Sequence, residues 1–516
     1  MSVSFGSGVS LREIFPRATF LNADDVKVGS CSSTLTDCRA QDLFVALLDV
    51  ETDGHEDAIQ AVSRRGARAV LTERLLPIDV PQCIVPDSRI AFGQLCHAMA
   101  SNPCRQINSI AVSGTDGKTS TAHLIQSIFE VAERNAILSS TLTRKVDQDA
   151  ITQPFLATTF AEMVKEQTEF GIVETSSVQL AEHRFAGAEF DVVALNNLRG
   201  NHFHVHQDLA NYRRAELRTF EYLKPGGVAV LNLDDPGCYF ALNKISVPTM
   251  TVGIKQDADV TAKLLECDLS GTTFLITAGD LTATVKTAIP GVAHVSNCLV
   301  AAAVGLLQGI DLQTIVRGIE RVTNLPGRMN VINCGQKFKL IVDQSQTAYR
   351  LGTALRTLRQ QVTGKVYCVF GADQAMHEQQ AAQLGRVFER MSNIPVLSQN
   401  CVSRTKSDGD GSQVIDIHDF EPLHRVLDGF DKPGKACVMP DRIQAVEWAL
   451  QQAKPGDGVL VAGCGEQPIA SLQKNRWQLT DTEVCQSWLY GESSPGQAPT
   501  LDVNPTILNI DDFRPC

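Results

Sequence analysis

The sequence lacks several features that would place the chain outside the ordinary globular class. None of its apolar runs reaches the roughly 18 residues that span a bilayer, so we expect no membrane insertion. The opening segment, MSVSFGSGVSLREIF, has no basic start followed by an apolar core, so we expect no secretory signal. The 15 cysteines include no Cys-x-x-Cys pair, and they predict reduced, mostly buried thiols in a cytoplasmic protein.

Positive charge is also scarce. Lysine and arginine number 46 against 58 aspartates and glutamates, which gives a formal net charge of −12. This balance argues against a non-specific grip on nucleic acid or on an anionic membrane, but it leaves room for a local basic pocket that holds a phosphorylated small molecule. With 43% hydrophobic and 20% charged residues, 516 residues predict about three globular domains.

Short apolar strands alternate with helical patterns along most of the chain, without an internal repeat. The alternation predicts an α/β fold with parallel sheets. A Thr-rich alternating stretch at 259–288 predicts a small antiparallel patch, and residues 491–500 a flexible tail. A polar, Pro-containing stretch at 101–106 suggests a boundary. We therefore predict an N-terminal α/β domain at 1–104, a central P-loop ATPase-like domain at 105–328 and a C-terminal Rossmann-like domain at 329–516.

The segment GTDGKTS, residues 114–120, lies between a predicted strand and a predicted helix. In this context glycines let backbone N–H groups converge on phosphate oxygens, and the helix N-terminus adds positive potential. We expect Lys118 to contact the β- and γ-phosphates and the Thr119 hydroxyl to hold Mg²⁺. The motif is shorter than a full Walker A, because Val112 stands where the first glycine is usual, so a purely structural turn is the alternative.

The segment NHFHVHQD, residues 201–208, places His202, His204 and His206 at every second position. Alternate residues of an extended segment point the same way, so the pattern admits a metal cradle. A metallo-hydrolase built on it needs further Asp and His ligands, and no suitable set follows in the sequence.

Motifs along nearly the whole chain resemble the Mur ligase family, in the family's order. The phosphate loop VSGTDGKTST is followed by ETSSVQLAEHR, NNLRGNHFHVH, GVAVLNLDDP, HVSNCLVAAA and LPGRM. The N-terminal TDCRAQDLFVALLDVETDGHEDAI is similar to the first domain of the MurE branch, which binds a uridine nucleotide.

This resemblance implies an ATP-dependent amide-bond ligase of peptidoglycan synthesis, with ATP and Mg²⁺ as cofactors. Such an enzyme adds diaminopimelate or lysine to UDP-N-acetylmuramoyl-L-alanyl-D-glutamate through an acyl phosphate. Phosphorylation turns a poor acylating carboxylate into one with a leaving group, and Mg²⁺ and Lys118 neutralise the developing charge. The expected partners are a UDP-muramoyl peptide and an amino acid, for a monomer that binds no nucleic acid.

The resemblance also implies roles for individual residues. Lys118, Glu174, His202 and Glu216 match catalytic positions, and Thr119 joins the last three as Mg²⁺ ligands. The expected ATP contacts are Gly114, Thr115, Asp116, Gly117, Lys118, Thr119, Ser120, Asn297, Arg328 and Asp343. The expected substrate contacts are Arg39, Thr152, Ser176 and Arg184. Plain structural roles compete, since Ser176 and Thr152 are small polar residues, Asn297 suits a helix cap and Arg328 a solvated turn.

Several positions depart from the family's pattern. Glu216 in NYRRAELRTF stands where the family has a carbamylated lysine, so it either supplies that negative charge or lies on a helix surface. Asn201 replaces an Asp, and Val178 a His. The third-domain motifs read QSQTAY at 344–349, GADQAMH at 371–377, QNCVS at 399–403 and GCGEQ at 463–467. The arginine that clasps diaminopimelate in MurE is thereby lost, and a nearby Ser is no substitute for a bidentate clamp.

These departures leave three readings open. The chain is a divergent ligase with an altered amine substrate, a MurE-like paralogue that binds nucleotide in a regulatory or scaffold role, or another amide ligase of the superfamily such as a folylpolyglutamate synthetase. The uridine-binding type of first domain argues against the last.

Overall fold

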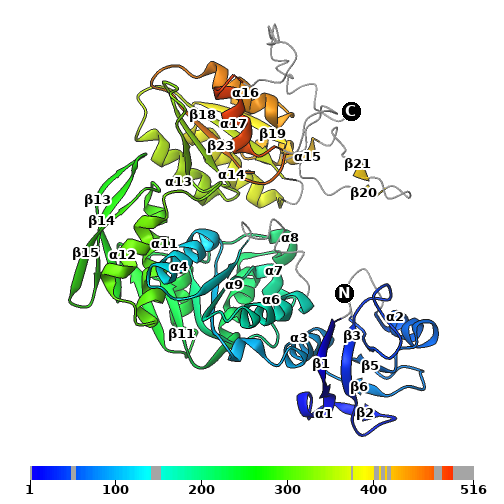
Figure 1. Ribbon diagram of the computed structural model, residues 1–516. Coiled ribbons are helices and arrows are strands. Elements are labelled where there is room, and N and C mark those ends of the chain that lie inside the picture. Colours follow the sequence, from blue (N-terminus) through cyan, green and yellow to red (C-terminus); the bar gives the residue numbers. More distant parts are fainter. Residues whose placement is uncertain are drawn as a thin grey trace. The chain divides into compact units, whose positions relative to one another are not determined.

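The structure is a computed structural model that describes residues 3–47, 54–140, 153–373, 376–399, 406–407, 413–414, 420–469 and 479–491 (Figure 1). Its contacts divide the chain into two compact units. The first comprises Met1–Arg199, Ala210–Val260 and Val300–Ile315, and the second comprises Gly200–Leu209, Thr261–Leu299 and Val316–Cys516. Each unit contains parallel sheet covered by helices, which confirms the predicted α/β class.

The first unit begins with a six-stranded sheet in the order β1-β3-β4-β5-β6-β2. Its strands are β1 (Val3–Ser10), β2 (Thr19–Leu21), β3 (Lys27–Ser32), β4 (Leu43–Val45), β5 (Ala69–Thr72) and β6 (Gln82–Ile84). The inner strands are parallel, and β1 and β2 close the two edges in antiparallel fashion. Along β4, Leu43 and Val45 pack on the side of α3 (Ser88–Met99), whereas Phe44 packs on the side of α2 (Gly54–Gln60). The alternation follows from the two-residue period of a strand.

A second sheet in this unit carries the phosphate loop. Its strands run parallel in the order β12-β11-β10-β7-β9-β8. They are β7 (Asn108–Ser113), β8 (Ala136–Ser139), β9 (Phe170–Glu174), β10 (Phe190–Leu195), β11 (Leu223–Asn232) and β12 (Thr249–Gly253). The helices between them are α4 (Lys118–Val131), α6 (Gln153–Lys165), α7 (Ser177–Ala181), α9 (Leu209–Leu217) and α10 (Pro236–Leu242). Because the strands are parallel, all their carboxyl ends lie at one edge, where ligands of such sheets bind.

The second unit holds the predicted antiparallel patch and the third sheet. The patch is β13 (Val260–Asp268), β14 (Gly271–Ala278) and β15 (Leu281–Thr287), with β14 and β15 antiparallel. The helices α11 (Val292–Leu307) and α12 (Leu312–Arg321) follow in the chain.

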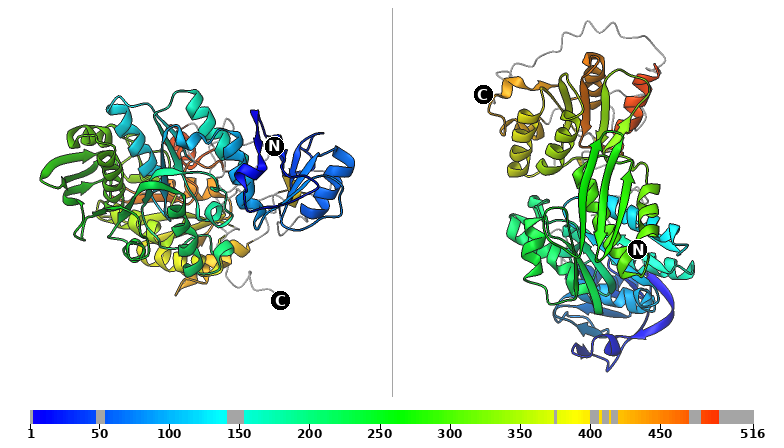
Figure 2. Two further views of the ribbon diagram at one scale, coloured as in Figure 1. Left: turned by 90° about the horizontal axis from the view of Figure 1, so that it is seen from below. Right: turned by 90° about the vertical axis from the view of Figure 1, so that its left-hand side faces the viewer.

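The third sheet has the order β16-β17-β23-β18-β19-β22. Its strands are β16 (Asn330–Ile332), β17 (Lys339–Asp343), β18 (Val366–Ala372), β19 (Ile394–Gln399), β22 (Cys437–Val438) and β23 (Gly458–Ala462). One face packs on α13 (Ala348–Arg359), α14 (Glu378–Met391) and α15 (Glu421–Leu427), and the other on α16 (Arg442–Gln452) and α17 (Asp481–Leu489), as the right-hand view of Figure 2 shows. The central strands are buried on both faces, so their sequences are continuous apolar runs.

Further expectations from the sequence concern the cysteines, membrane-spanning helices, the C-terminal tail and the domain boundaries. The 13 cysteines that the structure describes are free, and 10 of them are buried, as expected for reduced thiols. Among the described helices, none has the length and apolar character to cross a membrane. The tail expected at 491–500 lies, apart from Gly491, outside the described residues. The bounds of the three domains, 1–104, 105–328 and 329–516, stay predictions.

Candidate functional site

The phosphate loop has the strand–loop–helix geometry expected of it. Residues 114–117 connect β7 to α4, and Gly114 and Gly117 have φ values of 124° and 85°. Side chains are strained at such angles, so the two glycines permit the turn. Gly117 is the N-cap of α4 and provides no capping side chain, an arrangement that is typical of anion sites at helix N-termini.

Two asparagines that sequence reasoning missed support this loop from the end of β10. The backbone N–H of Thr115 donates to the Asn197 carbonyl at 3.1 Å, and that of Asp116 to Asn197 Oδ1 at 2.9 Å. Asn196 Nδ2 donates to Thr121 Oγ1 at 2.9 Å. A Cβ on Gly114 would lie 2.9 Å from the Asn197 carbonyl oxygen. The position of both residues directly after the strand next to β7 was the available signal.

The predicted ATP residues of the loop gather around the start of α4. The Lys118 ammonium donates to the Gly114 carbonyl at 2.7 Å, so it lies over its own loop. Thr119 Oγ1 donates to Glu174 Oε2 at 3.0 Å, and both residues are buried. A hydroxyl and a carboxylate are oxygen ligands of the kind that Mg²⁺ prefers, so this pair fits the ion.

Glu216 lies beneath the loop and is 1% exposed. The alternative of a helix-surface glutamate is therefore wrong. Its Oε2 accepts from Ser113 Oγ at 2.5 Å and its Oε1 from the Tyr212 hydroxyl at 2.9 Å. Burial raises the pKa of Glu216, while Lys118 and these hydrogen bonds oppose that rise. Burial, followed by the charge of Glu216, raises the pKa of Tyr212 well above its usual value.

Two of the predicted substrate residues of the first unit, Ser176 and Arg184, have structural partners. Ser176 is the N-cap of α7, where its hydroxyl accepts from the Gln179 N–H at 3.2 Å in a capping box. Arg184 forms an ion pair with Glu182 at 2.5 Å. Arg39 is exposed, and Thr152 lies outside the described residues. The substrate roles of all four stay predictions.

The remaining predicted residues belong to the second unit. His202 has a left-handed φ of 53°, and its ring lies 5.7 Å from that of His204. Asn297 is half-buried on α11, and Arg328 is half-buried in the turn before β16. Within the described residues, no three His, Cys, Asp or Glu side chains form a group that could hold a metal ion.

Asp343, at the end of β17, is almost fully buried and highly connected. Its Oδ2 accepts from the Met329 N–H at 2.8 Å, its Oδ1 from the Ser345 hydroxyl, and Arg350 lies 3.3 Å from both oxygens. These contacts hold the Pro-Gly-Arg turn against the carboxyl end of the sheet.

A second ion pair at this sheet edge was not expected from sequence. Arg442 and Asp481 are both 0% exposed and are joined by two hydrogen bonds of 2.8 Å. Arg442 also donates to the Ala462 carbonyl at 2.8 Å, and Asp481 accepts from the Gly465 N–H at 2.9 Å. The pair thus fixes the 463–467 turn, whose departure from the family's pattern stays a prediction.

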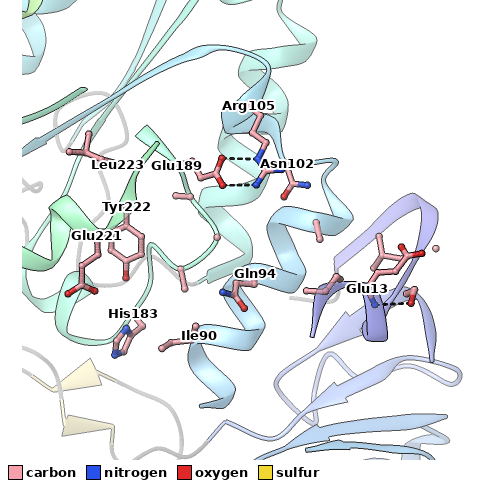
Figure 3. Close-up of a pocket in the computed structure, with 18 of the residues that line it drawn as sticks. Glu13, Ile90, Gln94, Asn102, Arg105, His183, Glu189, Glu221, Tyr222 and Leu223 are labelled. Atoms are coloured by element: carbon pink, nitrogen blue, oxygen red, sulfur yellow. Dashed lines mark hydrogen bonds and ion pairs between the residues drawn. The ribbon is translucent and has the colours of Figure 1, made fainter. Parts of the chain in front are cut away.

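The first unit also contains a cavity of about 990 Å³, lined by α1 (Leu11–Ile14), α3, His183 and the segments 186–189 and 221–223 (Figure 3). The bidentate pair of Arg105 and Glu189, at 2.8 and 2.7 Å, lies in its wall. Burial, followed by the charge of Arg218, lowers the pKa of His183 there. None of the predicted site residues lines this cavity.

Comparison with known proteins identifies the family. Residues 112–305 match the profile described as Mur ligase middle domain, and residues 327–465 match that of Mur ligase, glutamate ligase domain. A UDP-N-acetylmuramoyl-L-alanyl-D-glutamate--2,6-diaminopimelate ligase of Geobacillus thermodenitrificans is 32% identical over 438 residues, which cover 82% of this chain and 87% of the relative.

Solved structures agree on the fold. A UDP-N-acetylmuramoyl-L-alanyl-D-glutamate--2,6-diaminopimelate ligase has a TM-score of 0.64 at 23% identity, over 96% of this chain and 100% of its own. A MurF ligase of Thermotoga maritima, in complex with ADP, has a TM-score of 0.58 at 17% identity, over 89% and 97%. The resemblance noted in the sequence is thereby confirmed, and the chain belongs to the Mur ligase family.

Proposed function

We propose that the chain is an ATP-dependent ligase of the MurE type, which joins an amino acid to UDP-N-acetylmuramoyl-L-alanyl-D-glutamate in peptidoglycan synthesis. The observation that carries the proposal is the phosphate loop at the start of α4, whose geometry suits a bound anion. This loop belongs to a chain that is 32% identical to a diaminopimelate ligase over most of both lengths. The expected cytoplasmic location is part of this proposal.

The residues of the first unit have clear tasks in such a reaction. Lys118 exchanges its bond with the Gly114 carbonyl for the β- and γ-phosphates of ATP, and the N–H groups of the loop and of α4 orient the same phosphates. Thr119 and Glu174 would hold Mg²⁺, which supplies charge neutralisation as the phosphoryl group moves. His202 remains a further proposed ligand.

The acceptor carboxylate of the UDP-substrate attacks the γ-phosphorus, ADP leaves, and an acyl phosphate forms. The amine of the third substrate then attacks the acyl carbon, phosphate leaves, and the amine loses one proton. Preorganised donors at the phosphate loop stabilise the charge that builds up during transfer. Arg328 and Asp343 are proposed as nucleotide contacts of the second unit, together with Asn297.

The third substrate is the less constrained part of the proposal. The relative's name specifies 2,6-diaminopimelate, whereas the segment 399–403 of this chain has no arginine to clasp its distal carboxylate. We propose diaminopimelate as the first amine to test and lysine as the second.

The test is phosphate release from ATP with purified protein, Mg²⁺ and UDP-N-acetylmuramoyl-L-alanyl-D-glutamate, with and without each amine, and mass spectrometry of the product. Release that depends on the amine, with a matching tripeptide product, supports the ligase. Lys118→Ala is the inactive control, and Lys165→Ala, an exposed lysine of α6, is the matched active control. Nucleotide binding without product for any amine would favour a regulatory paralogue.

A further inference from the structure

Both carboxylate oxygens of Glu216 already accept hydrogen bonds, which disfavours the metal-ligand role that its place in the sequence implies. An ionised carboxylate offers about four lone-pair sites. Ser113 Oγ and the Tyr212 hydroxyl occupy one on each oxygen, at 2.5 and 2.9 Å. The residue is 1% exposed, so its remaining lone-pair sites lie away from solvent.

The hydrogen bonds around Glu216 form a directed chain that ends in the phosphate loop. The Arg199 N–H donates to Thr115 Oγ1 at 2.9 Å, so the Thr115 hydroxyl proton is free to go elsewhere. It goes to the Tyr212 oxygen at 2.7 Å, and Tyr212 in turn donates to Glu216 Oε1. These hydrogen bonds run from the Arg199 N–H through Thr115 and Tyr212 to the Glu216 carboxylate, which accepts the last of them.

Helix geometry explains why these two side chains act together. Tyr212 and Glu216 are four residues apart on α9, so both side chains lie on the same helix face, here the buried one. From that face Glu216 reaches Ser113 at the end of β7, while Tyr212 reaches Thr115 in the loop. Ser113 and Thr115, the residues on either side of Gly114, are therefore tied to one helix.

We propose that Glu216, with Tyr212, is a positioning residue that fixes the phosphate loop for nucleotide, and that it is not a ligand of a second Mg²⁺. The inference rests on the proposed function, because it assigns a task within the same nucleotide site. In this proposal the hydrogen bonds of Glu216 and Tyr212 hold the phosphate loop in place before any metal ion binds. The protein therefore needs no carbamylated side chain at position 216.

Removing the acceptor tests the proposal. Glu216→Gln keeps the shape but replaces one acceptor oxygen with an N–H₂ group, which faces donors and cannot accept from them. Tyr212→Phe removes the hydrogen bonds of the Tyr212 hydroxyl with Thr115 and Glu216 and leaves the carboxylate in place. The measurement is ADP affinity by calorimetry, in EDTA and in excess Mg²⁺, with thermal melting of each variant as the check of folding.

We expect both variants to bind ADP roughly 10- to 100-fold more weakly in EDTA, the change that follows loss of a hydrogen bond to a charged group. The ratio of affinities with and without Mg²⁺ should stay at the wild-type value. Glu174→Gln should show the opposite pattern. Its ADP affinity in EDTA should change little, and the ratio of its ADP affinities with and without Mg²⁺ should fall. Glu162→Gln, at an exposed position of α6, should change neither.

Glu216→Gln with unchanged affinity in EDTA and a lost Mg²⁺ effect would overturn the proposal and restore the metal-ligand role. If the melting temperature of Glu216→Gln is too low for the assay, Tyr212→Phe alone decides the question. Wild-type ADP affinity of Tyr212→Phe in EDTA would also reject the proposed role of these hydrogen bonds. A wild-type protein that binds ADP but forms no amide bond would sink the proposed ligase while leaving this inference intact.

Discussion

The phosphate-loop edge of the first unit and the carboxyl edge of the third sheet are supported in similar ways but differ in the charge beside the buried carboxylate. Both are ends of parallel strands, and at both a buried carboxylate ties backbone or side chains in place, Glu216 in one and Asp481 in the other. Glu216 accepts from the neutral hydroxyls of Ser113 and Tyr212, whereas Asp481 is paired with the buried Arg442. The loop at the first edge is proposed to bind nucleotide, and the departure of the 463–467 turn from the family's pattern stays a prediction. The comparison teaches that a buried carboxylate can be stabilised either by neutral donors or by an opposite charge.

Disruption of the buried ion pair of Arg442 and Asp481, which supports the 463–467 turn, should give the largest loss of stability. Arg442→Met leaves Asp481 charged and unpaired at 0% exposure, which we expect to cost about 3–5 kcal/mol of unfolding free energy. All three tryptophans, Trp448, Trp477 and Trp488, lie in the C-terminal part of the chain, so fluorescence during urea unfolding reports on that part.

The same comparison supplies its control. The double variant Arg442→Met with Asp481→Asn removes both charges and should recover part of the loss. A single variant as stable as wild type would show that the pair is not what supports the turn.

At the phosphate-loop edge, Lys118→Ala removes the cation that would neutralise the transferring phosphoryl group. We expect kcat for ligation to fall about 10²- to 10³-fold, as when one preorganised donor to a transition state is lost. Its ammonium donates to the Gly114 carbonyl of its own loop, so we expect only a small change in melting temperature. A large loss of stability instead would mean that the loop depends on Lys118 for its fold.

Gly114→Ala should have an intermediate effect. Its φ of 124° disfavours a side chain, and the new Cβ would lie 2.9 Å from the Asn197 carbonyl oxygen. Backbone strain of this kind costs about 1–3 kcal/mol, and we expect ADP affinity to fall with it because the loop must shift. Gly226→Ala is the matched control, since φ there is 83° with nothing within 4 Å of the added Cβ. If both variants bind ADP equally, the close contact with Asn197 is irrelevant to the loop.

The sequence predicted the parts of this molecule that have a local pattern. The strand–loop–helix context of 114–120, the apolar strands of the third sheet and the antiparallel patch at 259–288 all follow from periodicity and from glycine, and the structure confirms them. The support of Asn196 and Asn197 for the loop, and the pairing of Arg442 with Asp481, could not be predicted this way. Each joins residues from separate elements, and strand order decides which of them meet.

Glu216 illustrates the same limit from the other side. Its position in a motif suggested either a surface residue or a metal ligand, and neither alternative contained the burial that decides between them. Ser176 is similar, because its hydroxyl is engaged at the start of α7 whatever else it contacts. Motif position identifies which residues matter, whereas the hydrogen-bond partners determine how many of their polar atoms remain available.

The smallest effect should come from the second arginine–carboxylate pair at the carboxyl edge of the third sheet. Arg350 lies 3.3 Å from Asp343, and its side chain is 21% exposed, so water screens the pair. Arg350→Met also leaves Asp343 its bonds from Ser345 and the Met329 N–H. We therefore expect a loss of no more than about 1 kcal/mol by the same fluorescence measurement, the range of exposed pairs. A loss equal to that of Arg442→Met would show that burial does not separate the two pairs, and that the Pro-Gly-Arg turn depends on Arg350 as strongly as the 463–467 turn depends on Arg442.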